Sequence, residues 1–306
     1  MRKKCRWLQI VVFNPTFVGF FVSRHLGLLG CNIAIMKRFL PLLFILPLFL
    51  FFGCSENRKN TSMIAVDGWG KEGQVLKSLK NEAFNFPDSG FAYERKSDYV
   101  KQCLEAIQSN VQIIGLESFS DTIQIRFLRS REDMFWLTGS KPSGMANPYI
   151  NTVYLVADGN KTPPIKHELM HLITMLEWGY PHVSSTLINE GLAAYAEDNC
   201  NGYNVAQIYR YFMETDKLID IDSLTSDFYA QSEMIGYHQS ACVVEYLLNN
   251  YNNEQFKQLW TQGFDSFESI YGISFSKAKV DLEKALLKKY PSAPDIDWET
   301  FKEGCK

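Results

Sequence analysis

Two histidines four residues apart, His167 and His171, are the side chains best spaced for chemistry. They enclose Glu168 in His-Glu-Leu-Met-His, and the whole chain has only five histidines. On a helix, positions four apart lie one above the other, with Cβ atoms about 5–6 Å apart. Both imidazoles can therefore direct a nitrogen at one cation, at the roughly 2.0–2.1 Å that zinc prefers. Glu168 flanks the same face and is placed to hold a water rather than the ion. Hydrogen-bonded core histidines are the alternative for this motif alone.

A second segment, Asn-Glu-Gly-Leu-Ala-Ala-Tyr-Ala-Glu at 189–197, offers a further ligand. A catalytic zinc site uses three protein ligands and keeps one position open. Eighteen residues separate His171 from Glu190, enough to end one helix, turn, and bring a second helix back antiparallel. Glu190 would then face the histidine pair, and Glu197, seven residues later on the same helical face, could orient a histidine. The alternative is a pair of solvated charges on an amphipathic helix. The small residues between them would let this helix pack close to a neighbour.

The elements that must position these residues are predicted from apolar periodicity and capping residues. An amphipathic helix is predicted at 98–111, strands at 121–128 and 149–156, and a short helix between the strands that ends at Gly139. Helices are then predicted at 163–178, about 184–198, 205–214, about 231–251 and 275–289. The pattern indicates an α+β fold, with a small mixed or antiparallel sheet followed by a mainly helical bundle. Strand 149–156 is interpreted either as a plain sheet member or as an edge that pairs with an extended peptide.

The first 54 residues have the pattern of a targeting segment. They carry seven Lys/Arg and no Asp/Glu, and Lys37-Arg38 precede a 14-residue apolar run that ends at Gly53-Cys54. That run is too short to span a bilayer, which needs about 20 residues, so the pattern favours a lipoprotein signal peptide at 36–54, with Cys54 lipidated. Residues 1–35 are interpreted as an over-extended start or an extra N-terminal segment. Residues 55–66 are interpreted as a tether, and Asp-Gly-Trp-Gly-Lys-Glu-Gly at 67–73 as a turn rather than a nucleotide-binding loop.

Charge and cysteine content limit the possible partners and the redox state of residues 55–306. Without residues 1–54 the chain keeps 24 Lys/Arg against 34 Asp/Glu, and a surface that acidic disfavours nucleic acid as a partner. An acidic surface of this kind suits a folded domain that is tethered outside the cytoplasm. Four cysteines follow Cys54, so the sequence allows two disulfides in any of three pairings, or buried thiols. These are Cys103, Cys200, Cys242 and Cys305.

The two motifs and their gap resemble the gluzincin zinc metallopeptidases, which include thermolysin-like and aminopeptidase-N-like enzymes. With the lipoprotein signal and the helical tail, the chain looks more like the compact peptidase-MA-like lipoproteins of bacteria. The resemblance covers about residues 120–290. It implies a zincin-like catalytic domain over 67–306, with a helix-and-sheet part at 67–160 and a helical part at 161–306. It also implies one Zn²⁺ per chain, bound by His167, His171 and Glu190, with Glu168 as general base and acid.

Two further features concern the reaction. Gluzincins commonly stabilise the oxyanion with a Tyr or His that follows the third ligand, and the candidates here are Tyr237 and His238. Aminopeptidase-N relatives carry Gly-x-Met-Glu-Asn ahead of the metal-binding motif, whereas this chain has Gly-Met-Ala-Asn at 144–147, with Ala146 in place of the glutamate that grips a free amino end. The resemblance therefore favours an endopeptidase that acts on peptides or proteins by a metal-activated water. Its expected place is an outer-membrane, periplasmic or cell-surface lipoprotein. The alternatives are a catalytically silent binding or assembly lipoprotein and a purely structural lipoprotein.

Overall fold

The computed structural model describes residues 83–305. The predicted start segment, the signal peptide with Cys54, the tether and the 67–73 turn lie outside the described residues. Among the residues described, no helix is both long and apolar enough to cross a membrane.

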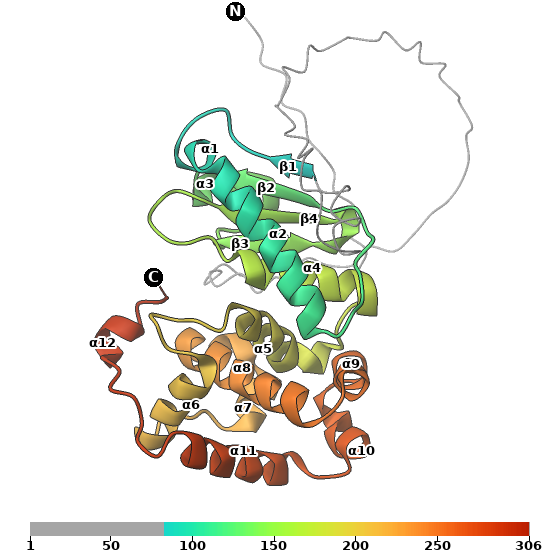
Figure 1. Cartoon of the computed structure of the whole chain (residues 1–306), viewed down its shortest axis with the longest axis vertical. Coiled ribbons are helices and arrows are strands. Elements are labelled where there is room, and N and C mark those ends of the chain that lie inside the picture. Colours follow the sequence, from blue (N-terminus) through green and yellow to red (C-terminus); the bar gives the residue numbers. More distant parts are fainter. Residues whose placement is uncertain (1–82, 306) are drawn as a thin grey trace, which may run out of the picture. The chain divides into compact units, whose positions relative to one another are not determined.

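A four-stranded mixed sheet forms the first layer (Figure 1). Its strands are β1 (Ala83–Asn85), β2 (Gln124–Leu128), β3 (Gly144–Asn147) and β4 (Thr152–Val156), in the order β1-β2-β4-β3. β1 and β4 both run parallel to β2, whereas β3 runs antiparallel to β4. The sheet and the helices after it confirm the predicted α+β fold.

The second predicted strand is an interior strand. β4 lies between β2 and β3, and all five of its residues are buried. The interpretation of 149–156 as a substrate-pairing edge is therefore wrong, because both edges of β4 are already paired. Tyr149 and Ile150, which the sequence pattern assigned to that strand, belong instead to the 3-10 turn Pro148–Ile150. The sheet edge that packs against α4 belongs to β3, which the pattern did not predict.

Three helices accompany the sheet: α1 (Phe91–Glu94), α2 (Lys96–Ile113) and α3 (Arg131–Thr138). α2 buries the apolar stripe that predicted it, including Val100, Ile107 and Val111, and packs against α4 (Ile165–Trp178). α3 ends as expected at Gly139, whose φ of 81° is the left-handed conformation that glycine adopts without steric cost.

The remainder of the described chain is helical (Figure 1). After α4 come α5 (Thr186–Glu197), α6 (Val205–Glu214), α7 (Ile221–Ser226), α8 (Glu233–Asn250), α9 (Asn253–Gln262), α10 (Phe267–Tyr271), α11 (Phe275–Lys289) and α12 (Trp298–Phe301). α6 and α11 match the predicted bounds to the residue. The predicted helices at 163–178, 184–198 and 231–251 correspond to α4, α5 and α8, each of which starts two residues later and ends at most one residue earlier than predicted.

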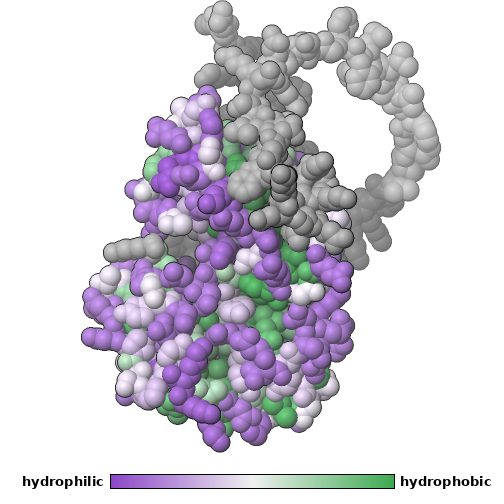
Figure 2. Space-filling model, viewed as in Figure 1, coloured by the Kyte–Doolittle hydropathy of each residue, from purple (hydrophilic) through white to green (hydrophobic). Residues whose placement is uncertain are grey.

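α5 connects α4 to α8 through close packing, as its small residues predicted. A Cβ at Gly191 would lie 2.8 Å from the backbone carbonyl of Ser240 on α8, so only glycine fits there. A large apolar cluster joins the sheet, α2, α4, α5 and α8, and a smaller one joins α6 to segment 291–305 through Phe212 and Phe301. The side of the molecule seen in Figure 2 is mainly hydrophilic, with apolar side chains showing only in smaller areas.

One disulfide, Cys200–Cys305, ties segment 291–305 to the residues that follow α5. Cys103 and Cys242 are buried thiols. The sequence left open disulfides or buried thiols, and the described cysteines include both: one disulfide and two buried thiols.

Candidate metal centre

Three ligand atoms from two helices converge on one point. His167 and His171 lie one turn apart on α4, and Glu190 reaches them from α5, which packs against α4 as predicted. The two Nε2 atoms are 3.1 Å apart, and Glu190 Oε2 lies 3.4 Å from that of His167 and 3.3 Å from that of His171. A tetrahedral zinc ion with bonds of roughly 2.0–2.1 Å holds its ligands about 3.3 Å apart. The triangle already has the size of one face of that tetrahedron.

The electrostatics of the triangle favour a cation. Glu190 Oε2 is buried and has no hydrogen-bond partner among the described residues. Burial by itself would raise the pKa of the Glu190 carboxyl, but the charges of His171 and His167 hold it below its ordinary value. In return, Glu190 raises the pKa of His171 to about 9 although burial opposes this. The group therefore stabilises positive charge between its members, and its donor set fits a divalent cation.

Asn189 fixes the orientation of His171. The Asn189 Oδ1 atom lies 2.9 Å from His171 Nδ1. An amide oxygen only accepts, so Nδ1 carries a hydrogen, and Nε2 is the nitrogen that faces the triangle and is available to a cation. Histidines that bind metal are usually oriented by such a partner. The sequence analysis assigned no role to Asn189, although its place directly before Glu190 could have suggested one.

Glu197 also lies beside this centre, but it contacts the backbone of His167 rather than an imidazole ring. Its Oε1 accepts a hydrogen bond from the His167 backbone N–H at 3.1 Å. That N–H belongs to the first turn of α4, where backbone donors have no partner within the helix, and the N-cap residue there is Pro164, which provides no side-chain cap. A carboxylate is also favoured at the positive end of a helix. Glu197 therefore anchors the turn that carries His167, whereas the sequence predicted a contact with an imidazole ring.

Glu168 lies between the triangle and the edge of the sheet. Its side chain is buried, which raises the pKa of its carboxyl, and the charges of His167 and His171 partly offset this. The carboxylate accepts a hydrogen bond from the Ala146 backbone N–H on β3. A Cβ at Gly144 would lie 2.5 Å from Glu168 Cγ, so β3 can approach this closely only with glycine there.

Two tyrosines complete the surroundings of Glu190. The Tyr229 hydroxyl donates to Glu190 Oε1 at 2.7 Å, and Tyr237 also forms a hydrogen bond with this carboxylate. The ring centroid of Tyr237 is 5.9 Å from that of His167. Tyr237 is thus brought to the centre, as the sequence predicted. Tyr229 was not predicted, because it lies in the 3-10 turn Phe228–Ala230, where no periodicity marks a functional residue.

The structure does not bring His238 to this group. Its Nδ1 lies 2.7 Å from the Met234 carbonyl oxygen, and its Nε2 lies 3.7 Å from Cys305 Sγ. Successive residues on a helix point about 100° apart. Because Tyr237 points toward Glu190, the next residue, His238, points away from it. A role for His238 beside the oxyanion therefore has no geometric support.

Residues 144–277, from β3 to the first turn of α11, match the model of the Peptidase MA superfamily. This match and the His-His-Glu geometry support a zincin-like peptidase. No curated protein sequence matches the chain.

Two solved structures have partial similarity to the fold. An M1 zinc metallopeptidase from Deinococcus radiodurans shares 15% identity over 68% of this chain and 45% of its own, with a TM-score of 0.34. A two-domain M1 zinc metallopeptidase, a point mutant bound to L-arginine, shares 13% identity over 70% of this chain and 49% of its own, with a TM-score of 0.30. The chain thus matches about half the length of each protein.

Proposed function

We propose that this chain is a zinc-dependent metallopeptidase that hydrolyses peptide bonds, with one Zn²⁺ held by His167, His171 and Glu190. The observation that carries the proposal is the triangle of ligand atoms, with sides of 3.1, 3.3 and 3.4 Å, around the partnerless Glu190 Oε2. Three protein ligands leave one position of a tetrahedral site for water or substrate, which is the arrangement of catalytic zinc.

Glu168 is the general base and acid. Bound zinc would supply Lewis acidity, which polarises the scissile carbonyl and acidifies the attacking water. Glu168 lies on the same helix as both histidines, takes the proton of that water, and passes it to the leaving amine. The Tyr237 hydroxyl, beside His167, donates a hydrogen bond to the oxygen that becomes negative in the transition state. Tyr229 holds Glu190 in its ligating position.

The substrate is an extended peptide bound along β3. Within residues 83–305 this strand pairs with β4 alone, and its main chain at Ala146 lies within hydrogen-bond reach of Glu168. Pairing of a peptide with a free strand edge would place a peptide bond beside the base. Ala146 has no carboxylate to hold a free amino end, so we propose that bonds within a chain are cleaved. Peptides with acetylated and free amino ends should then be cleaved at similar rates.

We also propose that Cys54 carries a lipid that anchors the enzyme outside the cytoplasm, at the outer membrane, in the periplasm or at the cell surface. The proposal rests on the basic and apolar pattern of residues 1–54 and on the acidic remainder of the chain. Incorporation of labelled fatty acid into the wild type, and its loss in Cys54→Ala, would test it.

Zinc content and peptide cleavage, measured together, test the main proposal. The full chain should hold one zinc and cleave a quenched peptide library, and Glu168→Gln should keep the zinc but lose about 10²–10⁴-fold in activity. Glu132→Gln, which changes an exposed glutamate on α3, is the matched control and should behave as wild type. Bound zinc without cleavage by the wild type would identify the silent binding protein instead. Equal cleavage by wild type and Glu168→Gln would exclude Glu168 as the base.

A further inference from the structure

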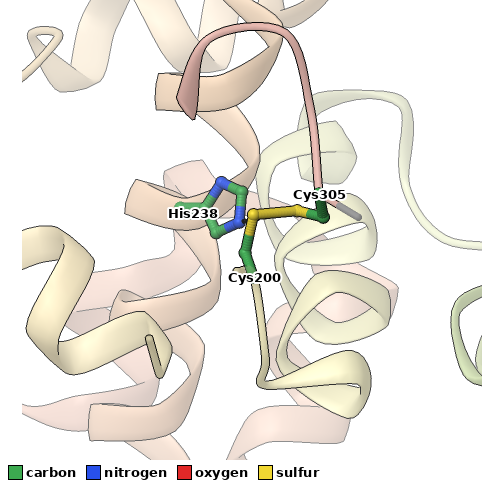
Figure 3. A group of neighbouring side chains, drawn as sticks. All are labelled: Cys200, His238 and Cys305. Atoms are coloured by element: carbon green, nitrogen blue, oxygen red, sulfur yellow. Dashed lines mark hydrogen bonds between the residues drawn. A yellow bond between two sulfur atoms is a disulfide. The ribbon is translucent and has the colours of Figure 1, made fainter. Parts of the chain in front are cut away.

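A second group of potential metal ligands lies around the disulfide. Cys200 Sγ, Cys305 Sγ and His238 Nε2 all lie within 4.8 Å of one another. Figure 3 shows the ring of His238 pointing toward the two sulfurs, which come from different segments of the chain. None of these residues belongs to the centre proposed above.

His238 presents a lone pair to the sulfurs. Its Nδ1 lies 2.7 Å from the Met234 carbonyl oxygen, which can only accept, so Nδ1 carries the hydrogen. Burial lowers the pKa of His238, although the Met234 hydrogen bond opposes this, so the ring is neutral at neutral pH and Nε2 carries a lone pair. Nε2 lies 3.7 Å from Cys305 Sγ, and a disulfide sulfur has no hydrogen to donate. His238, only 9% exposed, therefore directs at the disulfide an acceptor nitrogen that has no donor among residues 83–305.

This orientation is the one that metal-binding histidines have. A ligating imidazole almost always donates its other N–H to a carbonyl or carboxylate, which fixes the ring and raises its basicity. Met234 provides that carbonyl from the preceding turn of the same helix. We propose that, when the disulfide is reduced, Cys200, Cys305 and His238 bind a divalent cation of the Zn²⁺ type, forming a second, redox-gated metal site.

The chemical steps balance with a dithiol reductant. The dithiol gives two electrons to the Cys200–Cys305 bond and becomes a cyclic disulfide, while its two protons pass to the released thiols. The cation then displaces both protons and binds two thiolates and one neutral imidazole. This ligand set is that of known Cys₂His zinc sites, and it leaves a fourth position for water.

The surrounding chain lets the sulfurs separate. Two thiolates on one zinc ion lie about 3.8 Å apart, so one sulfur must move away from the other after reduction. Cys200 is held in a two-residue bridge with Tyr203, and His238 is held in α8. Cys305 is exposed and follows Gly304, so it is the ligand that can adjust. Its exposure also admits the reductant.

Cobalt binding to the full chain tests this site, because Co²⁺ bound by thiolate shows a sulfur-to-metal charge-transfer absorption. The protein would be titrated with Co²⁺ as isolated and after anaerobic reduction with a trialkylphosphine, which takes up the oxygen of a water as it reduces the disulfide. We expect reduction to add one bound cobalt per chain together with the charge-transfer band. The centre at His167 contains no sulfur and is present in both redox states, so its occupancy cannot mimic this result.

Two variants identify the ligands. Cys200→Ser/Cys305→Ser keeps every other cysteine of the chain and should gain neither cobalt nor the band on reduction. His238→Ala should bind the added cobalt at least about tenfold more weakly. Peptide mapping of the oxidised variant should still find the Cys200–Cys305 bond, and His238→Gln replaces it if the alanine variant does not fold. The proposal is overturned if reduced wild type gains no cobalt with a thiolate band, or if both histidine variants bind it as tightly as wild type.

Discussion

The Tyr229 hydroxyl lies 2.7 Å from Glu190 Oε1, so this tyrosine donates to the oxygen of Glu190 that faces away from the histidines. The other oxygen, Oε2, lies within 3.4 Å of both imidazole nitrogens. The two oxygens of one carboxylate thus have separate partners. The carboxylate cannot rotate without breaking the contact with Tyr229, and Oε2 stays directed at the metal position.

Tyr229→Phe should therefore weaken metal binding. The ring keeps its packing on Phe228, and only the hydroxyl that orients Glu190 is lost. Loss of a partner that orients a ligand typically costs 10–100-fold in metal affinity, and we expect a decrease of that order. Competition for zinc against a chromophoric chelator measures it. Tyr203→Phe, which removes a hydroxyl bonded to the Asp295 carbonyl, is the control and should leave the affinity unchanged. Equal affinities for Tyr229→Phe and wild type would show that Glu190 needs no such restraint.

Gly144→Ala should reduce activity without removing the metal. The new Cβ would lie 2.5 Å from Glu168 Cγ and 2.8 Å from Pro164 Cγ, so either Glu168 or β3 must move. A misplacement of about 1 Å can cost about 10²-fold in rate, and we expect a fall in kcat/KM of this order at unchanged zinc content.

Gly236→Ala is the matched control for that substitution. Its Cβ would meet Leu224 Cδ2 at 3.5 Å, an ordinary contact, and alanine is the better helix former by up to about 1 kcal/mol. Activity should be kept, and the melting temperature should not fall. Wild-type activity in Gly144→Ala would mean that the position of Glu168 tolerates the displaced strand.

Gly191→Ala should destabilise the fold itself. The added Cβ would lie 2.8 Å from the Ser240 carbonyl, and backbone cannot move aside as a flexible side chain can. Forcing extra volume into a close-packed contact typically costs about 1–3 kcal/mol. Chemical denaturation should show a loss of this size. If Gly191→Ala lost no more unfolding free energy than Gly236→Ala, α5 and α8 would be able to move apart at little cost.

The sequence predicted those parts of the site whose signal is local. His167 and His171 lie four apart on one amphipathic helix, and the spacing to Glu190 allowed one return helix, so the sequence predicted that these three side chains meet, as the structure shows. Helix α6 was likewise predicted to the residue, because Asn204 and Gln207 form a capping box at the start of its apolar stripe.

The parts that the sequence did not predict depend on distant partners. β3 is four residues long, Gly-Met-Ala-Asn, with little β-propensity, and it is a strand only because β4 pairs with it. The start of α4 was placed too early, since its first turn is anchored by Glu197, 30 residues away, rather than by a local cap. Tyr229 reaches Glu190 from an irregular turn. Periodicity carries no information about such contacts.

A like-charge pair, Glu245 and Asp198, gives the protein a stability that depends on pH. Glu245, half-buried on α8, has a pKa raised first by burial and then by the charge of Asp198, with Lys289 partly offsetting both. A carboxyl whose folded pKa lies above its ordinary 4.5 binds more protons in the folded state. Its stabilising contribution is therefore complete below its unfolded pKa and is lost as the pH rises through its folded pKa.

Glu245→Gln should remove that loss. The amide keeps the shape of the side chain but cannot ionise, so the variant should unfold at a higher temperature than wild type at pH 8 and show the smaller decline in stability between pH 5 and pH 8. Thermal unfolding followed by circular dichroism at several pH values measures this. Glu117→Gln, at an exposed position, should follow the wild-type curve. If Glu245→Gln also followed it, Glu245 would be ionised at no cost, and burial beside Asp198 could not be the source of the pH dependence.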